Sequence, residues 1–571
     1  MSIKVGNYLF TRLKQLGIDT VFGVPGDYEL ALLDLIGESG VDFCGNPNEL
    51  IAGYAADGYG RMKGAGSFVT TFGPGELSAY CSQAGAYAEF VPVAHVVGYP
   101  GRPAMKNHTL MHHTLGTGEF GMYREMAEKI SVDTTVLMDP QTAPAEIDRC
   151  LTAMMQQSRP VYIGVPVDMS HLECDGTGLK TPLKTALSPN NASLETRVVS
   201  KLREWMETSK QPIIIVDGNA VRNNVADKCR VLSQLTGFPT FTTYMGKGGV
   251  DETTPNFGGL YTGAGTYEGV KRAVESADAV FWVGNVQTDF NTGEFTDQVS
   301  EDVTAEFQRY YVKIGKERYD LKMVHVLDAL VNDLKKHPLT RTSTPSVNWD
   351  PYPMNSPERP AHLTQDYLWP TLGKFLQPGD FLIGETGTSA FGLGCSKLPR
   401  GASMYNQTVF GSIGYATGAA VGAFKAIRET GAFKRCILVT GEGSLHLTVQ
   451  AFADLLKLGL RPVVFVLNND GYTVERLIHG EDAFYNKLPN WDYSKLAPAF
   501  GPDHQSRYYG PIGTPDELDK VLADKQFAQA GCFQLVELKL GRLDAPLPLR
   551  MATAAVEAFN QRSERNGSKK L

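Results

Sequence analysis

The sequence predicts an α/β protein of several domains, each built on a parallel sheet flanked by helices. At roughly 150 residues per domain, 571 residues suggest about three or four domains. Short apolar runs rich in Val, Ile and Phe alternate with helical stretches, which is typical of βα units around parallel sheets. Two Pro-, Gly- and polar-rich stretches, Asp175–Ser193 and His337–His362, have the composition of linkers and divide the chain into thirds.

Nine apolar runs are the candidate strands, which is too many for one sheet. They are Ser67–Thr71, Ala94–Val97, Val161–Val165, Ile213–Val216, Ala279–Val283, Phe381–Ile383, Cys436–Thr440, Val463–Leu467 and Gln534–Leu538. With the linkers, they predict α/β domains over residues 1–182, 190–342 and 360–556 and a C-terminal tail over 557–571, with the last helix running to about Asn560.

Composition excludes several classes of function. The formal charge is −8, and no block of like charges marks a surface for nucleic acid or anionic membrane. No apolar run reaches membrane-spanning length, and the polar start of the chain is not a secretory signal. Eight cysteines stand far apart without a C-x-x-C pair, which favours a reducing compartment. We expect a cytoplasmic protein; the final Lys-Lys-Leu resembles the peroxisomal S-K-L address only loosely.

Both outer thirds place glycine-rich turns directly after apolar strands, at residues 70–75 and 439–444. In open α/β sheets ligands bind outside the carboxyl ends of the strands. In the last third, one strand runs into Gly441-Glu442-Gly443-Ser444 and the next runs into Asn468-Asn469-Asp470-Gly471. Carboxylate, amide and main-chain oxygens suit Mg²⁺, and the glycines and Ser444 suit a diphosphate. Taken singly, each turn fits an ordinary strand-to-helix connection better than a ligand site.

The pair of turns resembles the diphosphate-and-metal motif of thiamine diphosphate enzymes, since Asn469 follows Glu442 by 27 positions. The wider sequence resembles the pyruvate decarboxylase family, collinearly from about residue 4 to residue 555. The matching segments are Val24–Asp27, Asn48–Leu50, Ala55–Tyr59, Thr70–Gly73, His112–His113, Glu385–Phe391, Gly411–Gly414 and Asn469–Gly480.

This resemblance implies a thiamine diphosphate-binding fold that occurs twice, as a first, pyrimidine-binding domain and a third, diphosphate-binding domain, with a middle α/β domain between them. Glu49 matches the carboxylate that bonds a pyrimidine nitrogen, Ile413 the apolar residue that props the cofactor in a V shape, and Gly411 the carbonyl that receives its amino group. The other cofactor contacts that the resemblance implies are Thr388, Ser412, Glu442, Gly443, Ser444, Asn469, Asp470, Gly471, Tyr472, Thr473 and Val474, with Glu442, Asn469 and Gly471 on Mg²⁺.

The resemblance further implies an acid–base cluster of Asp27, His112, His113 and Glu475, which acts with Glu49. Decarboxylation of a 2-oxo acid leaves a carbanion, for which the cofactor supplies the electron sink, and the later proton transfers suit His, Asp and Glu. Asp27, His113, Glu475, Phe290 and Phe391 are the expected substrate contacts, with Val474 also on the pocket wall. Two structural histidines remain an alternative for His112 and His113.

The implied activity is non-oxidative decarboxylation of a 2-oxo acid, with pyruvate as the leading substrate and aromatic or branched acids left open. Carboligation to an acyloin and a degenerate, non-catalytic homologue are the alternatives. The resemblance also implies a homodimer or homotetramer, with the site between the first domain of one subunit and the third of another.

The chain departs from the family pattern at several positions. Glu442 stands where the family has Asp, and Asn219 stands at the regulatory cysteine of yeast-type enzymes, so activation through a thiol there is in doubt. Tyr28-Glu29 replaces the more frequent Phe-Asn, and Pro74 lies in the turn after the strand that ends at Thr71. Since Tyr28, Glu29 and Pro74 lie near the expected pocket, we expect them to influence substrate choice.

Overall fold

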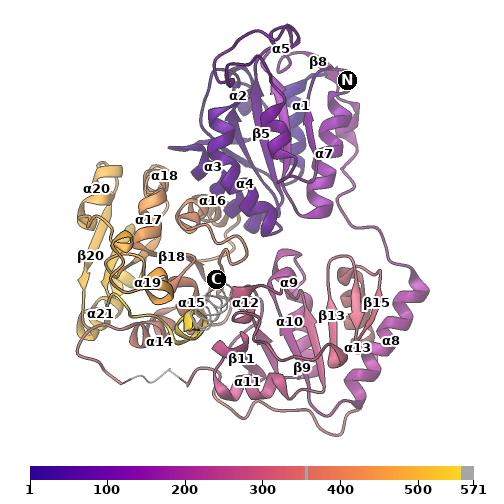
Figure 1. Ribbon diagram of the computed structural model, residues 1–571. Coiled ribbons are helices and arrows are strands. Elements are labelled where there is room, and N and C mark those ends of the chain that lie inside the picture. The colour runs from indigo at the N-terminus through magenta and orange to yellow at the C-terminus, as the bar shows by residue number, and fades with distance from the viewer. Residues whose placement is uncertain (354–357, 555–571) are drawn as a thin grey trace, which may run out of the picture.

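The computed structural model describes residues 1–353 and 358–554. It contains three α/β units (Figure 1): the first at the top, the second at the lower right and the third at the left. Each unit has its own sheet, as the α/β prediction expects. No helix in the described ranges is both long and apolar enough to cross a membrane.

The first sheet has six parallel strands in the order β3-β2-β4-β5-β7-β6. Its strands are β2 (Thr20–Gly23), β3 (Asp42–Gly45), β4 (Gly66–Thr71), β5 (Val93–Tyr99), β6 (Thr134–Val136) and β7 (Val161–Pro166). The helices around it are α1 (Val5–Gln15), α2 (Leu30–Leu33), α3 (Glu49–Lys63), α4 (Pro74–Ala88), α5 (Arg102–Lys106), α6 (Met122–Ala127) and α7 (Ala143–Gln157). β1 (Ser2–Lys4) pairs separately with β8 (Glu173–Asp175).

The middle sheet has seven strands in the order β11-β10-β9-β12-β13-β14-β15, antiparallel only from β13 to β15. Its strands are β9 (Pro212–Val216), β10 (Thr240–Thr242), β11 (Phe257–Leu260), β12 (Ala279–Val283), β13 (Thr304–Phe307), β14 (Val312–Ile314) and β15 (Glu317–Tyr319). Its helices are α8 (Ala192–Thr208), α9 (Gly218–Arg222), α10 (Ala226–Thr236), α11 (Glu268–Glu275), α12 (Asp289–Thr292) and α13 (Met323–Lys336).

The third sheet has six parallel strands in the order β17-β16-β18-β19-β21-β20. Its strands are β16 (Asp380–Gly384), β17 (Ser403–Tyr405), β18 (Arg435–Gly441), β19 (Val463–Asn468), β20 (Ser506–Ile512) and β21 (Phe533–Lys539). Its helices are α14 (Gln365–Phe375), α15 (Thr388–Gly394), α16 (Tyr415–Thr430), α17 (Glu442–Thr448), α18 (Ala451–Lys457), α19 (Thr473–His479), α20 (Leu496–Phe500), α21 (Pro515–Leu522) and α22 (Lys525–Ala528).

All nine apolar runs named from the sequence are strands, with ends that differ by at most two residues. The stretch taken as the first linker is not wholly irregular, because its first residue ends β8 and its last two begin α8. β8 was missed because Glu173 and Asp175 are exposed and only Cys174 between them is buried. The helix expected near Asn560 and the tail over 557–571 lie outside the described residues.

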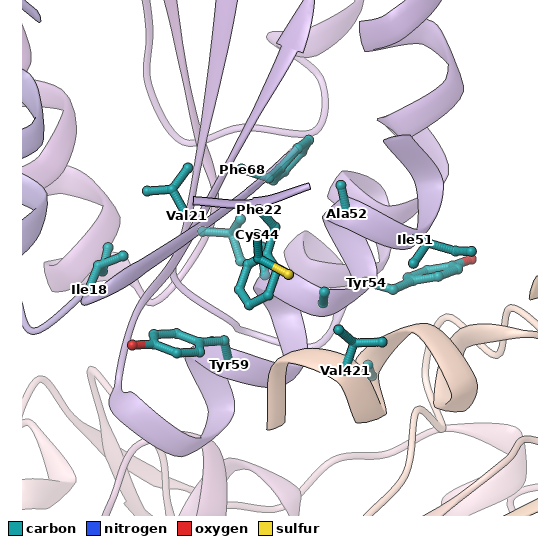
Figure 2. Packing of buried hydrophobic residues seen from close by; sticks show 14 of the residues in the cluster. Ile18, Val21, Phe22, Cys44, Ile51, Ala52, Tyr54, Tyr59, Phe68 and Val421 are labelled. Carbon is teal, nitrogen blue, oxygen red and sulfur yellow. The ribbon is translucent and has the colours of Figure 1, made fainter. Parts of the chain in front are cut away.

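The first and third units share one hydrophobic core through α3 and α16 (Figure 2). The two backbones approach so closely that a Cβ added at Gly422 would lie 1.7 Å from the Ala55 carbonyl oxygen, and one added at Gly58 would lie 2.1 Å from that of Ala419. Only glycine fits such a contact. At the same interface, the Tyr54 hydroxyl donates to Ser412 Oγ at 3.0 Å, so α3 helps to position the loop that carries Ile413.

Candidate active site

Two neighbouring strands of the third sheet deliver the residues of the proposed metal motif. β18 and β19 run in parallel with Gly441 opposite Leu467, so Glu442 and Asn469 follow at the same edge of the sheet. Glu442 Oε1 accepts hydrogen bonds from the backbone N–H of Asn469 at 3.1 Å and of Gly471 at 2.7 Å. The register of one strand pair therefore brings these three residues together.

The side-chain amide of Asn469 points one of its two polar atoms at acceptor oxygens only. That atom lies 2.7 Å from the Gly471 carbonyl oxygen and 3.0 and 3.2 Å from the carboxylate oxygens of Glu442. As nitrogen, it donates to them while the amide oxygen accepts from the Thr473 hydroxyl at 2.6 Å. If this atom is the amide oxygen of Asn469, it forms a cluster of four oxygens with the Gly471 carbonyl oxygen and the two carboxylate oxygens of Glu442. Oxygen atoms are the ligands that a hard divalent cation requires. The residues present therefore fit Mg²⁺.

Glu442 is a buried carboxyl group whose ionised form a nearby positive charge would stabilise. Its side chain is 4% exposed, and burial raises its pKa to about 7 against the opposing effect of the hydrogen bonds from Gly471 and Asn469. A bound cation favours the ionised form of such a group. The carboxylate of Glu442 thus lies buried beside the backbone amides of Asn469 and Gly471.

A cavity of about 1070 Å³, including its opening to solvent, lies beside this motif. Its lining comprises Tyr244, Phe290, residues 386–391, Asn406, Gln407, Thr408, Gly411, Ile413, residues 441–444, Asn469, residues 471–475 and Leu549. An added Cβ at Gly441 would meet nothing within 4 Å, so the backbone there is open to a ligand. Of the expected third-domain contacts, Ser412 and Asp470 do not line the cavity.

One wall of the cavity is aromatic and apolar. Phe391 meets Phe290 edge-on at 5.8 Å and Tyr244 at 4.9 Å between ring centroids, and Val474 and Leu549 pack with them. Sequence reasoning missed Tyr244 and Leu549, which carry no local signal. It also missed Asn406, Gln407 and Thr408, although a polar triplet at the carboxyl end of β17 is a detectable signal.

The first unit carries a second group of polar side chains. Ligand atoms of Asp27, His112 and His113 lie within 4.8 Å of one another. His112 Nε2 is 2.6 Å from Asp27 Oδ2, and His113 Nε2 is 3.9 Å from Asp27 Oδ1. Glu49 is the first residue of α3, whose N-terminus is capped by Asn48. The Glu49 side chain lies close to the backbone of Gly75, since a Cβ added at Gly75 would be 3.2 Å from Glu49 Oε1.

The two groups remain separate within one chain. Asp27, Glu49, His112 and His113 line no part of the cavity that described residues of the middle and third units form, whereas Glu475 does. The chain therefore presents two half-sites: one with the acid, imidazole and Glu49 groups, and one with the metal motif and the apolar wall.

Glu29, two residues after Asp27, is an unusual buried acid. Its side chain is fully buried, and neither carboxylate oxygen has a hydrogen-bond partner among the described residues. Burial raises the pKa of Glu29 to about 7. Because Asp27 is close and negative, it adds to this rise.

We expect Glu29→Gln to stabilise the protein at pH 8 but not at pH 4.5. As pH rises from 4.5 to 7, the unfolded chain ionises at Glu29 while the folded chain does not, so the parent loses up to about 3 kcal/mol of stability that the amide retains. Urea unfolding of both proteins across this range measures the difference. A difference that is constant with pH would contradict the buried, protonated acid.

Comparisons with known proteins match nearly the whole length of the chain. Family models of thiamine pyrophosphate enzymes match in three parts: the N-terminal TPP binding domain at residues 3–117, the central domain at 199–334 and the C-terminal TPP binding domain at 385–534. Pyruvate decarboxylase isozyme 3 of Saccharomyces cerevisiae is 44% identical, over 98% of this chain and 99% of its own length. The pyruvate decarboxylases of Candida glabrata and Aspergillus fumigatus are 42% and 39% identical, each over 98% of this chain and at least 98% of their own.

Proposed function

The chain belongs to the thiamine pyrophosphate enzymes and, within them, to the pyruvate decarboxylase family, and on that premise we propose that it converts pyruvate to acetaldehyde and CO₂ without oxidation. The observation that carries this proposal is the convergence of Glu442, Asn469 and Gly471 beside a cavity with an apolar wall. Full-length similarity to enzymes named for this reaction supports it.

We propose that Glu442, Asn469 and the Gly471 carbonyl hold Mg²⁺. The backbone from Gly441 to Ser444 would then hold the diphosphate at the start of α17, where N–H groups point outward. Thr388, Gly411, Ile413 and the segment 472–474 line the space next to it, while Glu49 and Ser412 stand outside this lining. When bound, thiamine diphosphate supplies the electron sink for the carbanion that decarboxylation leaves.

We propose that the proton transfers belong to Asp27, His112, His113 and Glu475. Asp27 lies within hydrogen-bond distance of His112, so a proton can pass between these two groups without a change in their net charge, and His113 Nε2 is 3.9 Å from the other carboxylate oxygen of Asp27. Glu475 extends from α19 into the cavity wall. The apolar wall of Phe290, Phe391 and Val474 excludes water from the reacting carbon and fits the small methyl group of pyruvate.

We propose a homodimer as the smallest active form, with a homotetramer as its expected assembly. A single chain keeps its two half-sites apart, and a second copy can bring its Asp27 and Glu49 to the cavity of the first. Such closed symmetric assemblies are common among oligomeric enzymes. All eight cysteines are free thiols, which is typical of a reducing compartment, and we therefore propose a cytoplasmic enzyme.

The test is the purified protein with Mg²⁺ and thiamine diphosphate, supplied with a panel of 2-oxo acids while CO₂ and products are measured. We expect CO₂ and free aldehyde in equal amounts, fastest with pyruvate. Acyloin as the main product, with aldehyde released only in traces, would favour carboligation. Absence of cofactor binding in millimolar Mg²⁺ would identify a non-catalytic homologue, the possibility that Glu442 raises.

A further inference from the structure

The turn that carries His112 and His113 is held by two tyrosine hydroxyls. Tyr28 donates to the carbonyl oxygen of His112 at 3.2 Å, and Tyr123 donates to that of His113, also at 3.2 Å. His113 adopts a left-handed backbone conformation with φ of +69°, which non-glycine residues adopt rarely. Because such a conformation needs support from its surroundings, the two hydroxyls are well placed to provide it.

Tyr28 also contacts the imidazole ring of His112. The two rings are stacked, with centroids 4.8 Å apart and planes inclined by 15°, and the Tyr28 hydroxyl oxygen is 3.3 Å from His112 Nδ1. Tyr28 itself is 6% exposed and packs among Phe72, Val97 and Tyr99. Its hydroxyl is thus fixed between a backbone carbonyl and a ring nitrogen of the same residue.

The two contacts of this hydroxyl determine where the protons lie. A carbonyl oxygen can only accept, so the single hydroxyl proton of Tyr28 goes to the His112 carbonyl. The hydroxyl oxygen is then left as an acceptor, and His112 Nδ1 must carry a proton to donate to it. Burial and the charge of Asp27 raise the pKa of Tyr28, so its hydroxyl keeps its proton at neutral pH.

The other ring nitrogen faces a carboxylate. With a proton on Nδ1, a neutral His112 has no hydrogen on Nε2, which lies 2.6 Å from Asp27 Oδ2. Two unprotonated acceptors do not approach so closely, so one further proton lies between them. The pair consists of an imidazolium beside a carboxylate or of a neutral imidazole beside a carboxylic acid; both hold one proton more than neutral His112 with ionised Asp27.

We propose that Tyr28 is a positioning residue whose hydroxyl oxygen, by accepting from His112 Nδ1, keeps a transferable proton on the Asp27–His112 pair. The role rests on the proposed function, in which this pair delivers a proton toward the product aldehyde. The titratable groups that face the pair in the described residues are Tyr28 on the same segment as Asp27 and His113 on the same turn as His112. Buried Glu29 follows Tyr28 in sequence and adds a negative charge only when it ionises.

The test compares the holoenzyme with Tyr28→Phe, which keeps the stacked ring and removes one oxygen. Histidine labelled with ¹³C, assigned through His112→Gln, reports the titration of His112 without the need for turnover. We expect the midpoint of this titration to fall by about half to one pH unit in Tyr28→Phe, because the protonated ring loses an acceptor. The pH profile of aldehyde release should move in the same direction.

Tyr123→Phe is the matched control, since Tyr123 holds the same turn through the His113 carbonyl and makes no hydrogen bond to an imidazole. It should leave the His112 midpoint within about 0.2 pH unit of the parent. An unchanged or raised midpoint in Tyr28→Phe, or equal shifts in both variants, overturns the proposal. If the parent releases no CO₂ from any 2-oxo acid, the proposed function fails, while the titration of His112 still decides the role of Tyr28.

Discussion

Glu442→Gln is expected to weaken the binding of thiamine diphosphate in Mg²⁺ by about 100-fold or more. The substitution keeps the length of the side chain but removes the negative charge from a site that is 4% exposed, and loss of one partner of a buried charge pair is costly. Calorimetric titration of the cofactor at fixed Mg²⁺ measures the effect. Thermal unfolding without cofactor checks that the fold is unaffected.

Glu442→Asp is the matched variant. It keeps the charge and restores the shorter acid of the family pattern, so we expect cofactor affinity and activity to be equal to the parent or higher. Since Mg²⁺ demands near-octahedral geometry, the shorter carboxylate can approach it at least as well. If Glu442→Asp abolished activity, the site would have to be built around the longer side chain and its bonds to the Asn469 and Gly471 amides.

The second large effect is expected at His113. His113→Phe should slow aldehyde release by about 10²- to 10⁴-fold, the range in which a positioned acid or base acts, and leave cofactor binding nearly unchanged. The reason is the location of His113 on the first unit, away from the metal motif and 3.9 Å from Asp27. Rapid-quench measurement of aldehyde release and titration of the cofactor separate the two effects.

A parallel loss of cofactor binding and turnover in His113→Phe would indicate a structural role for this histidine. That outcome is a real alternative, because His113 has a left-handed backbone and its carbonyl lies against Gly73. His113→Gln, which keeps a polar side chain of similar size, helps to distinguish the two roles. If both variants bind the cofactor and release aldehyde slowly, the proton-transfer role stands.

Much of the fold was predictable because buried parallel strands are continuous apolar runs. β12 (AVFWV) and β19 (VVFVLN) are fully buried, and the pattern identified them directly. β15 (ERY) and β20 (SRYYGPI) are edge strands that are only partly buried and lack a continuous apolar run, so their composition does not distinguish them from loops. The fully buried strands β2 (TVFG) and β10 (TFT) were also missed, because they lack a continuous apolar run; recognition therefore required such a run as well as burial.

The candidate site was predictable where its chemistry is local in sequence. Glu442 and Asn469 each directly follow a recognisable strand, so the strand register brings them together. Tyr244 reaches the same cavity from the middle unit, and such tertiary proximity leaves no mark in a single sequence. The complete burial of Glu29 and the double contact of Tyr28 with His112 likewise depend on packing between distant segments.

The most direct test of the composite site is complementation between two inactive variants. A hybrid dimer contains one Glu49→Gln chain and one Glu442→Gln chain. If each active site is shared between subunits, one site combines the intact Glu49 of the second chain with the intact metal motif of the first. The other site carries both substitutions, so each dimer keeps one intact active site. At a cofactor concentration that saturates the parent but not Glu442→Gln, we predict that co-expressed, purified hybrids recover about half of the parental CO₂ release, while each variant alone is nearly inactive. Hybrids that assemble yet release no CO₂ would contradict the account.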